Sequence, residues 1–216
     1  MLFTKWSTIY SGVGRKSDAK QRLLEAAQDL IWENSYGVVT IDAICEKAGV
    51  KKGSFYYFFE SKADLAVAAL DHEWQTEIKP KFDTMFSVSN PPLERIRLMF
   101  QSCIDCQAEI QKEYGQILGC PCFSLGSEIC TQNEPIRAKV QETLARLVRY
   151  LESAIRDAQA EGSIAPGDPL VKAKSAYALY EGSLAQARIA NDLEPLRLMI
   201  DAVMDLLGVA VEARPG

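Results

Sequence analysis

The chain has 216 residues, of which 48% are hydrophobic and 25% are charged. This much apolar surface can build a folded core, so the composition excludes an intrinsically disordered protein. No apolar run approaches the roughly 18 residues of a membrane span, and the N-terminus lacks the uninterrupted apolar stretch of a signal peptide. We therefore expect a cytoplasmic protein without membrane contact, whose six cysteines are reduced thiols.

The formal net charge of -5 is distributed unevenly along the chain. Residues 1–62 carry nine Lys and Arg against seven Asp and Glu, whereas the rest of the chain is acidic. A short N-terminal module with a positive face could therefore bind a polyanion while attached to an acidic body. The chain length fits such a module fused to a larger domain.

Residues 1–16 are expected to form an N-terminal tail without fixed structure. Its basic residues Arg15 and Lys16, together with Lys20, could reach a minor groove or could simply be solvated. From Asp18 to Asn34, apolar residues recur at positions 23, 24, 27, 30 and 31. This spacing predicts a helix with one buried face.

Short helices follow this first one. Thr40 is placed to cap a helix that Gly49 can end in the left-handed conformation. The stretch "VKKGSFYYF", residues 50–58, is expected to form a further short helix. Two short helices joined by a turn are a helix-turn-helix. Ser61, followed three residues later by an aspartate, gives a capping signal for a fourth helix that we expect to run to about Phe86.

The stretch "TIDAICEKAGVKKGSFYYFFESKADL", residues 40–65, resembles the DNA-binding signature of the tetracycline-repressor (TetR) family of one-component transcriptional regulators. A weaker resemblance to the ligand-binding domain of one TetR subgroup is carried by "GCPCFSLGSEI" at 119–129, "AQAEGSI" at 158–164 and "YEGSLAQAR" at 180–188. The resemblance implies an all-α protein. We expect a helix-turn-helix domain over residues 17–62 and a helical effector-binding and dimerisation domain over residues 63–216.

In the expected recognition helix, Phe55 and Phe59 lie four residues apart and face the core. The polar and aromatic residues around them can then reach the groove and its phosphates. By resemblance, Tyr56 and Lys62 are the phosphate anchors, while Gly53 lets the backbone approach the duplex closely. The predicted DNA-binding residues are Thr40, Lys51, Lys52, Gly53, Ser54, Tyr56, Tyr57 and Lys62.

The acidic body is expected to contain helices near residues 92–112, 117–131, 134–161, 168–189 and 192–209. "NPP" at 90–92 and "EGSIAPGDP" at 161–169 interrupt the helical pattern. The last two helices are apolar on more than one side, so the sequence predicts a two-fold homodimer. We place Leu184 in the seam of this dimer.

The resemblance further implies a pocket for a small-molecule effector, which the sequence does not identify. Apolar and aromatic residues of the body are candidates to line it, although each could equally be plain core. The predicted ligand-binding residues are Trp74, Ile78, Phe82, Met99, Cys103, Phe123 and Tyr177. We expect no cofactor, and no residue is assigned to a metal site.

Four cysteines leave an alternative open. Cys103 and Cys106 share a helical face, while Cys120 and Cys122 flank a proline. These thiols could be inert packing, could sense an electrophile or oxidant, or could bind copper(I) or zinc.

The function expected from these features is that of a repressor that binds palindromic operator DNA as a dimer and is released by an effector. One alternative is the thiol- or metal-responsive sensor, and a remoter one is a helical scaffold or adaptor that binds no DNA. An enzyme would need a thiol nucleophile with His72 as its base, and no catalytic set stands out. We therefore predict no catalytic residues.

Overall fold

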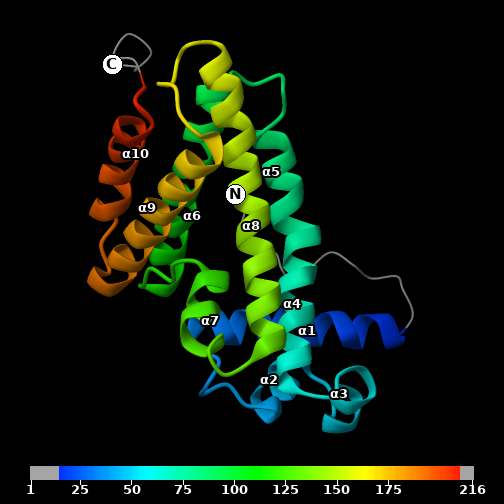
Figure 1. The fold of residues 1–216 in the computed structure, drawn as a ribbon. Coiled ribbons are helices and arrows are strands. Elements are labelled where there is room, and N and C mark those ends of the chain that lie inside the picture. Colours follow the sequence, from blue (N-terminus) through cyan, green and yellow to red (C-terminus); the bar gives the residue numbers. More distant parts are fainter. Residues whose placement is uncertain (1–14, 210–216) are drawn as a thin grey trace. The chain divides into compact units, whose positions relative to one another are not determined.

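The computed structural model describes residues 15–209 of the chain. Regular structure in this range is helical apart from one isolated antiparallel bridge between Ile164 and Val209, which confirms the predicted all-α fold. The contacts divide the chain into two compact units, and Figure 1 shows the helices that form them. The first unit comprises Met1–Glu77 and Pro121–Thr143, and the second comprises Ile78–Cys120 and Leu144–Gly216. Among the described helices, none combines the length and the apolar character needed to cross a bilayer.

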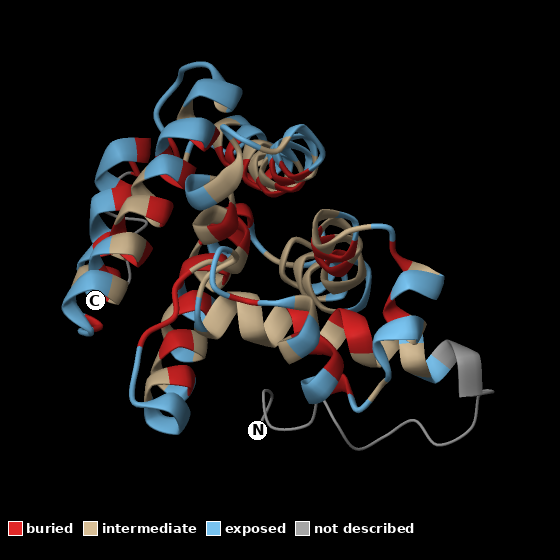
Figure 2. Cartoon of the chain, turned by 90° about the horizontal axis from the view of Figure 1, so that it is seen from below, coloured by how far each residue is buried: buried red, intermediate tan, exposed pale blue. Residues whose placement is uncertain are grey.

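The first unit is built around α1 (Arg15–Glu33). This helix contacts α2 (Ile41–Ala48), α3 (Lys52–Phe58), α4 (Lys62–Glu73) and α7 (Pro121–Ile129). The predicted stripe of α1 is confirmed, because Leu23 and Ala27 are completely buried. Figure 2 shows the buried positions of the helices in red. The largest side chains without exposed surface in this core are Leu23, Ile44, Phe55 and Leu65.

The predicted helix caps of the first unit are confirmed. The Thr40 side chain accepts a hydrogen bond from the Ala43 N–H at 3.1 Å, and Ser61 accepts one from the Asp64 N–H at 3.1 Å. Gly49 ends α2 with φ 62°, the left-handed conformation in which a residue with a side chain is strained. These local signals fix the turn between α2 and α3.

The prediction of one continuous fourth helix to about Phe86 is wrong. The chain stays helical to Met85, but not as a single α-helix. α4 ends at Glu73, a π-helical segment spans Trp74–Ile78, and α5 (Lys79–Met85) follows. Pro80 lies at the start of α5, where its missing N–H cannot donate to a carbonyl of the preceding turn. The π-helical turn absorbs this loss, so residues 61–86 are not one uniform rod.

The second unit contains α5, α6 (Pro92–Tyr114), the part of α8 (Glu134–Ala160) from Leu144 onward, α9 (Pro169–Ala190) and α10 (Glu194–Leu207). The long helices predicted for the body are therefore confirmed to within a few residues. α10 packs against α9 and α6. Buried Arg95 of α6 donates to Asp157 of α8 at 2.6 Å and to the Asn90 carbonyl at 2.8 Å, which ties two helices and a turn together.

The helix predicted over residues 117–131 begins only at Pro121, because Ile117–Cys120 is not helical. Gly119 has φ 71°, which interrupts a helix. The Gln107 side chain accepts a hydrogen bond from the Gly119 N–H at 3.0 Å and donates to its carbonyl at 3.3 Å. The Asn191 side chain accepts from the Ile117 N–H at 2.9 Å. We name residues 117–120 the strap, since side chains of α6 and of the α9 C-cap hold its backbone.

The predicted position of Leu184 in a dimer seam is wrong. Leu184 is 2% exposed and lies in a core cluster of the second unit together with Cys103, Ile117 and Leu196. Helical periodicity identified an apolar residue but could not show that its own unit covers it. The large apolar residues that stay exposed on α9 and α10 include Ile189 at 86% and Leu198 at 62%.

The predicted tail 1–16 lies outside the described residues except for Arg15 and Lys16, with which α1 begins. The predicted DNA-binding domain 17–62 lies wholly inside the first unit. As a separate domain it stays a prediction, and so does the effector domain 63–216, whose residues belong to both units.

Candidate nucleic-acid interface

α3 has two chemically different faces. Phe55 is fully buried and Phe59, just after the helix, is 6% exposed, as the sequence predicts. Tyr56 and Tyr57 are 55% and 66% exposed, although large aromatic side chains are usually covered in a folded protein. The Tyr56 ring packs edge-on against Phe55, with 5.1 Å between the ring centroids, and this contact restrains its position. The Tyr57 ring packs edge-on against Phe58, with 4.8 Å between the centroids, so the outward face presents two phenols that are each held by a neighbouring ring.

The first residues of α3 are exposed to solvent and carry positive charge. Lys51, Lys52 and Gly53 are exposed, and Ser54 is half-buried. Apart from its chain neighbours and the backbone of its own helix, a Cβ atom built on Gly53 would meet no heavy atom of the described residues within 4 Å, and its φ is not positive. Neither backbone strain nor packing against residues 15–209 requires glycine here, and glycine lowers the stability of a helix. An external surface that approaches this backbone closely would account for it.

Lys52 is paired within the protein. Its ammonium lies 2.8 Å from the Asp42 carboxylate of α2, and this hydrogen-bonded partner raises the pKa of the lysine. Both side chains are more than half exposed, so the pair is readily exchanged for another anion. The charge of Lys52 is thus available to a phosphate, in competition with Asp42.

Lys62 has a structural role that the sequence does not reveal. Its ammonium donates to the carbonyls of Tyr36 at 2.7 Å and Val39 at 2.8 Å, and it lies 4.1 Å from the centre of the Tyr36 ring. Burial lowers the pKa of this lysine. Two of its three N–H groups hold the segment before α2, which leaves one for the phosphate contact implied by the resemblance.

Glu128 of α7 supports the candidate interface from behind the segment before α2, and sequence reasoning missed it. Its carboxylate accepts hydrogen bonds from the backbone N–H groups of Tyr36 at 2.9 Å and Gly37 at 2.6 Å. We name these contacts the Glu128 clasp. Together with Lys62, the clasp fixes the segment that leads to the Thr40 cap and α2. The only sequence signal was the glutamate within "GCPCFSLGSEI", whose partner is 91 residues away.

Thr40 is exposed, but its hydroxyl already caps α2. A contact between Thr40 and DNA therefore stays a prediction, as do the other predicted DNA contacts. The structure places these residues on α3 and around the first turns of α2 and α4.

The predicted ligand-binding residues are divided between the two units. Trp74 and Phe123 belong to the first unit, and Ile78, Phe82, Met99, Cys103 and Tyr177 belong to the second. Within the second unit, Phe82 stacks on Phe86 at 5.6 Å between ring centroids and packs against Tyr150 at 5.3 Å. Cys103 belongs to a different core cluster. Their role toward a ligand stays a prediction.

The cysteines differ in their availability for chemistry. Cys103 is buried, and burial raises the pKa of its thiol to about 12, which keeps it protonated. Cys122 is also buried, whereas Cys106 and Cys120 are half-buried. The thiol-sensing alternative therefore depends on Cys106 and Cys120. Among residues 15–209, no group of three His, Cys, Asp or Glu side chains is arranged to hold a metal ion.

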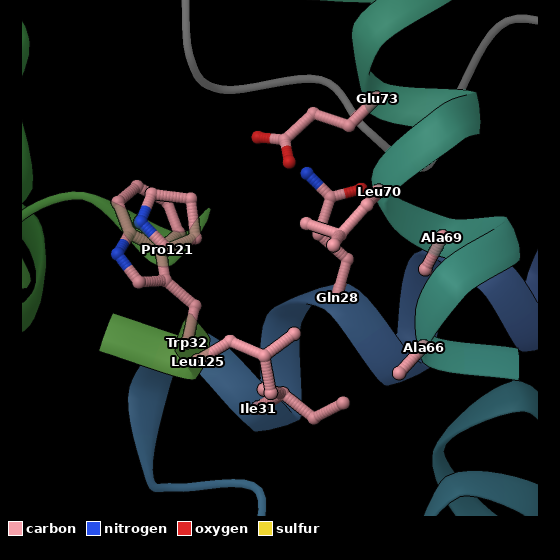
Figure 3. Close-up of a pocket in the computed structure, with 9 residues that line it drawn as sticks. All are labelled: Gln28, Ile31, Trp32, Ala66, Ala69, Leu70, Glu73, Pro121 and Leu125. Atoms are coloured by element: carbon pink, nitrogen blue, oxygen red, sulfur yellow. The ribbon is translucent and has the colours of Figure 1, made fainter. Parts of the chain in front are cut away.

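A pocket of the first unit was not predicted from the sequence. It lies among α1, α4 and α7, and Figure 3 shows Glu73 and Gln28 on one side and Trp32 with Pro121 on the other. Small and aliphatic side chains such as Ala66 and Leu125 also line it. The pocket borders α1, and α2 and α3 pack against α1. A change in how this pocket is filled would therefore alter the surface on which α2 and α3 rest.

Comparison with known proteins agrees with this geometry. Residues 23–69 match the family described as bacterial regulatory proteins, tetR family, and residues 92–203 match the tetracyclin repressor-like C-terminal domain. The first match includes α2, α3 and the supporting face of α1. Together the two matches include residues from the predicted DNA-binding domain and from the predicted effector domain.

Individual relatives match over most of their length. The transcriptional regulator AcuR of Cereibacter sphaeroides is 30% identical over 187 residues, which cover 86% of this chain and 83% of that protein. The HTH-type transcriptional repressor NemR of Escherichia coli K12 is 25% identical over 193 residues, which cover 88% of this chain and 94% of NemR.

Solved structures share the fold. The crystal structure of reduced E. coli NemR has a TM-score of 0.80 at 24% identity and covers 90% of this chain and 99% of its own. The regulatory protein TetR from Rhodobacter sphaeroides has a TM-score of 0.77 at 28% identity, with 87% and 98% covered. The exposed α3 face, the helix-turn-helix that carries it and these matches lead to one conclusion: the chain belongs to the tetR family of DNA-binding transcription regulators.

Proposed function

We propose that this chain is a repressor that binds a palindromic operator as a homodimer, with one α3 in each of two major grooves. The observation that carries the proposal is the exposed start of α3, where Gly53 lets another molecule approach the backbone closely and Lys51 and Lys52 directly precede it. The relatives NemR and DhaR are described as repressors, and AcuR as a regulator. The tetR family is a family of transcription regulators, which is not an enzyme class.

In the proposed complex, Lys51 and Lys52 neutralise phosphates, while Tyr56 and Tyr57 reach the backbone and base edges from the outward face of α3. Lys62 keeps one N–H for a phosphate while its other two hold the segment before α2. Ser54 lies between these groups, and Thr40 stands at the start of α2. The protein acts in the compartment that holds the DNA, which we take to be the cytoplasm.

The operator can be found by selecting protein-bound duplexes from a random-sequence pool. We expect an inverted repeat whose half-site centres lie about 34–36 Å apart, one turn of DNA, or a multiple of that spacing. The matched control is Lys51→Ala/Lys52→Ala/Tyr56→Ala, which changes only exposed residues and should select nothing. Enrichment of single half-sites would contradict the dimer, and no enrichment by the folded wild type would contradict DNA binding.

We further propose that a small molecule binds the helical body and lowers operator affinity. Effector-linked coupling is typically about 1–3 kcal/mol, which corresponds to a change of about 5- to 150-fold. Linkage requires operator DNA to weaken effector binding by the same factor. Calorimetry with and without saturating operator measures both sides of this cycle, and equal effector affinities would contradict the proposal.

A further inference from the structure

A carboxyl group lies buried in the second unit. Glu181 of α9 is 3% exposed, although a glutamate is rarely buried unless it is paired. The hydroxyl of Tyr177, one turn earlier on the same helix, donates to Glu181 Oε1 at 2.6 Å. Among residues 15–209, the groups that shift the pKa of this carboxyl include no lysine or arginine. Within the part of the chain that the structure describes, its burial is thus not offset by a cation.

The second oxygen of this carboxyl is not satisfied. Among the described residues, no N–H or O–H group donates to Glu181 Oε2. Burial raises the pKa of Glu181, and the hydrogen bonds of Tyr177 and the Cys120 thiol oppose that rise only in part. A buried polar atom without a partner is costly and rare in folded proteins. A donor from outside the chain would remove this cost.

Aromatic rings pack beside Tyr177, the residue that donates to this carboxyl. The Tyr177 and Tyr180 rings lie 5.5 Å apart, and Tyr180 lies 5.9 Å from Phe100 of α6. A carboxylate beside aromatic faces is the combination that recognises organic ammonium groups, because the ring face and the carboxylate both attract positive charge. A neutral donor or a buried water would gain only the hydrogen bond.

We propose that Glu181 is the anchor for a protonated amine on the effector, with the rings of Tyr177, Tyr180 and Phe100 beside its apolar part. This inference rests on the proposed function only in that the helical body takes an effector. It assigns the chemical class of that ligand: a small organic ammonium ion with an aromatic or aliphatic body. Tyr177 acts as a positioning residue, since its hydroxyl orients the carboxyl.

The first test needs no ligand. The double substitution Tyr177→Phe/Glu181→Leu replaces a hydrogen-bonded pair and its unsatisfied oxygen by apolar groups of similar size. If Glu181 serves a ligand, the melting temperature of the ligand-free protein should stay the same or rise. A fall of more than about 4 °C, which corresponds to roughly 1–2 kcal/mol for a chain of this length, would show that the pair supports the fold and would overturn the proposal.

The second test measures charge preference with benzylamine and its neutral analogue benzyl alcohol. By calorimetry, the wild type should bind benzylamine about tenfold or more tightly than the alcohol. Glu181→Gln should abolish this preference while keeping the shape of the site. Glu113→Gln, at an exposed position of α6 in the same unit, should retain it. Equal binding of both probes by the wild type, or a preference that survives in Glu181→Gln, would overturn the proposal.

Operator binding measured on the same samples separates this inference from the proposed function. If the wild type binds operator but shows no preference for benzylamine, the amine site fails and the regulator stands. If benzylamine binds through Glu181 and leaves operator affinity unchanged, the amine site stands and its role as an effector site fails.

Discussion

Glu128 and Gly37 lie 91 positions apart in the chain and are joined by a hydrogen bond of 2.6 Å from the Gly37 N–H to the Glu128 carboxylate. A Cβ atom at Gly37 would lie 3.0 Å from Glu128 Oε1, so the contact leaves little room for a larger residue. The clasp therefore links α7 to the segment that places α2. A perturbation of α7 would be transmitted to the DNA-binding helices through this contact.

Loss of the Glu128 clasp should weaken both the fold and DNA binding. Glu128→Ala removes the acceptor of two backbone N–H groups, and we expect a loss of about 1–3 kcal/mol in the free energy of unfolding. Operator affinity should fall as well, because the segment before α2 loses a constraint. Urea unfolding and a fluorescence binding titration measure the two effects. Ser127→Ala, the neighbouring exposed position on α7, is the control and should be neutral.

Gly53→Ala should separate stability from function. The new methyl group has open space in the free protein, and alanine favours a helix over glycine by up to about 1 kcal/mol. We expect a slightly more stable protein that binds operator about tenfold or more weakly, because the methyl group meets the duplex. Gly182→Ala in α9, where a Cβ is equally unobstructed, should stabilise without changing DNA affinity. Unchanged operator binding by Gly53→Ala would remove Gly53 from the interface.

Substitutions of Lys52 and of its partner Asp42 should change DNA affinity in opposite directions. Lys52→Ala should weaken specific and nonspecific binding alike and make the slope of log affinity against log salt shallower by about one unit. Asp42→Asn releases Lys52 from its competitor and removes a negative charge, so it should strengthen binding. Titrations over a range of salt concentrations measure both. Lys79→Ala, which breaks an exposed ion pair with Asp83 in the second unit, should leave the slope alone.

Lys62 should differ from Lys52 in its effect on stability. Lys62→Met removes two hydrogen bonds to carbonyls and a contact with the Tyr36 ring, so we expect a loss of about 1–3 kcal/mol in the free energy of unfolding. The salt slope should also become shallower by about one unit if its third N–H meets a phosphate. Lost stability with an unchanged slope would leave Lys62 a purely structural residue.

The thiol of Cys103 should be inert. Its pKa of about 12 in the folded protein lies above the 9.0 of an ordinary thiol, so very little thiolate exists near neutral pH. Alkylation by iodoacetamide followed by mass spectrometry should therefore label Cys106 and Cys120 before Cys103.

The raised pKa of Cys103 also has a consequence for stability. Because the unfolded chain releases this proton at lower pH, Cys103 should destabilise the fold progressively as pH rises from about 9 to 12. Labelling of Cys103 at the rate of an exposed thiol would contradict both statements.

The sequence predicted the features that depend on neighbouring residues. The caps at Thr40 and Ser61, the left-handed Gly49 and the inward face at Phe55 all arise within one or two turns of the chain. The spacing of these residues is enough to specify them, because the helix geometry itself brings the partners together.

The features that the sequence did not predict join distant residues. Glu128 meets Gly37, and Lys62 meets the Tyr36 carbonyl, only after the first unit has packed. The apolar pattern of α9 showed that Leu184 belongs in a core, but periodicity cannot tell the core of one unit from a dimer seam. The π-helical turn at Trp74–Ile78 was missed because Pro80 allows either a kink or a local change of hydrogen bonding.

The strap has a consequence for amide hydrogen exchange. The Ile117 and Gly119 N–H groups are bonded to the side chains of Asn191 and Gln107 and not to a helical carbonyl. Their exchange with solvent deuterium therefore requires those side-chain bonds to open, whereas it does not require any helix to unwind. These two amides would exchange at a rate that differs from the rates of the helical amides. That rate would measure how often the strap opens while the helices around it stay intact.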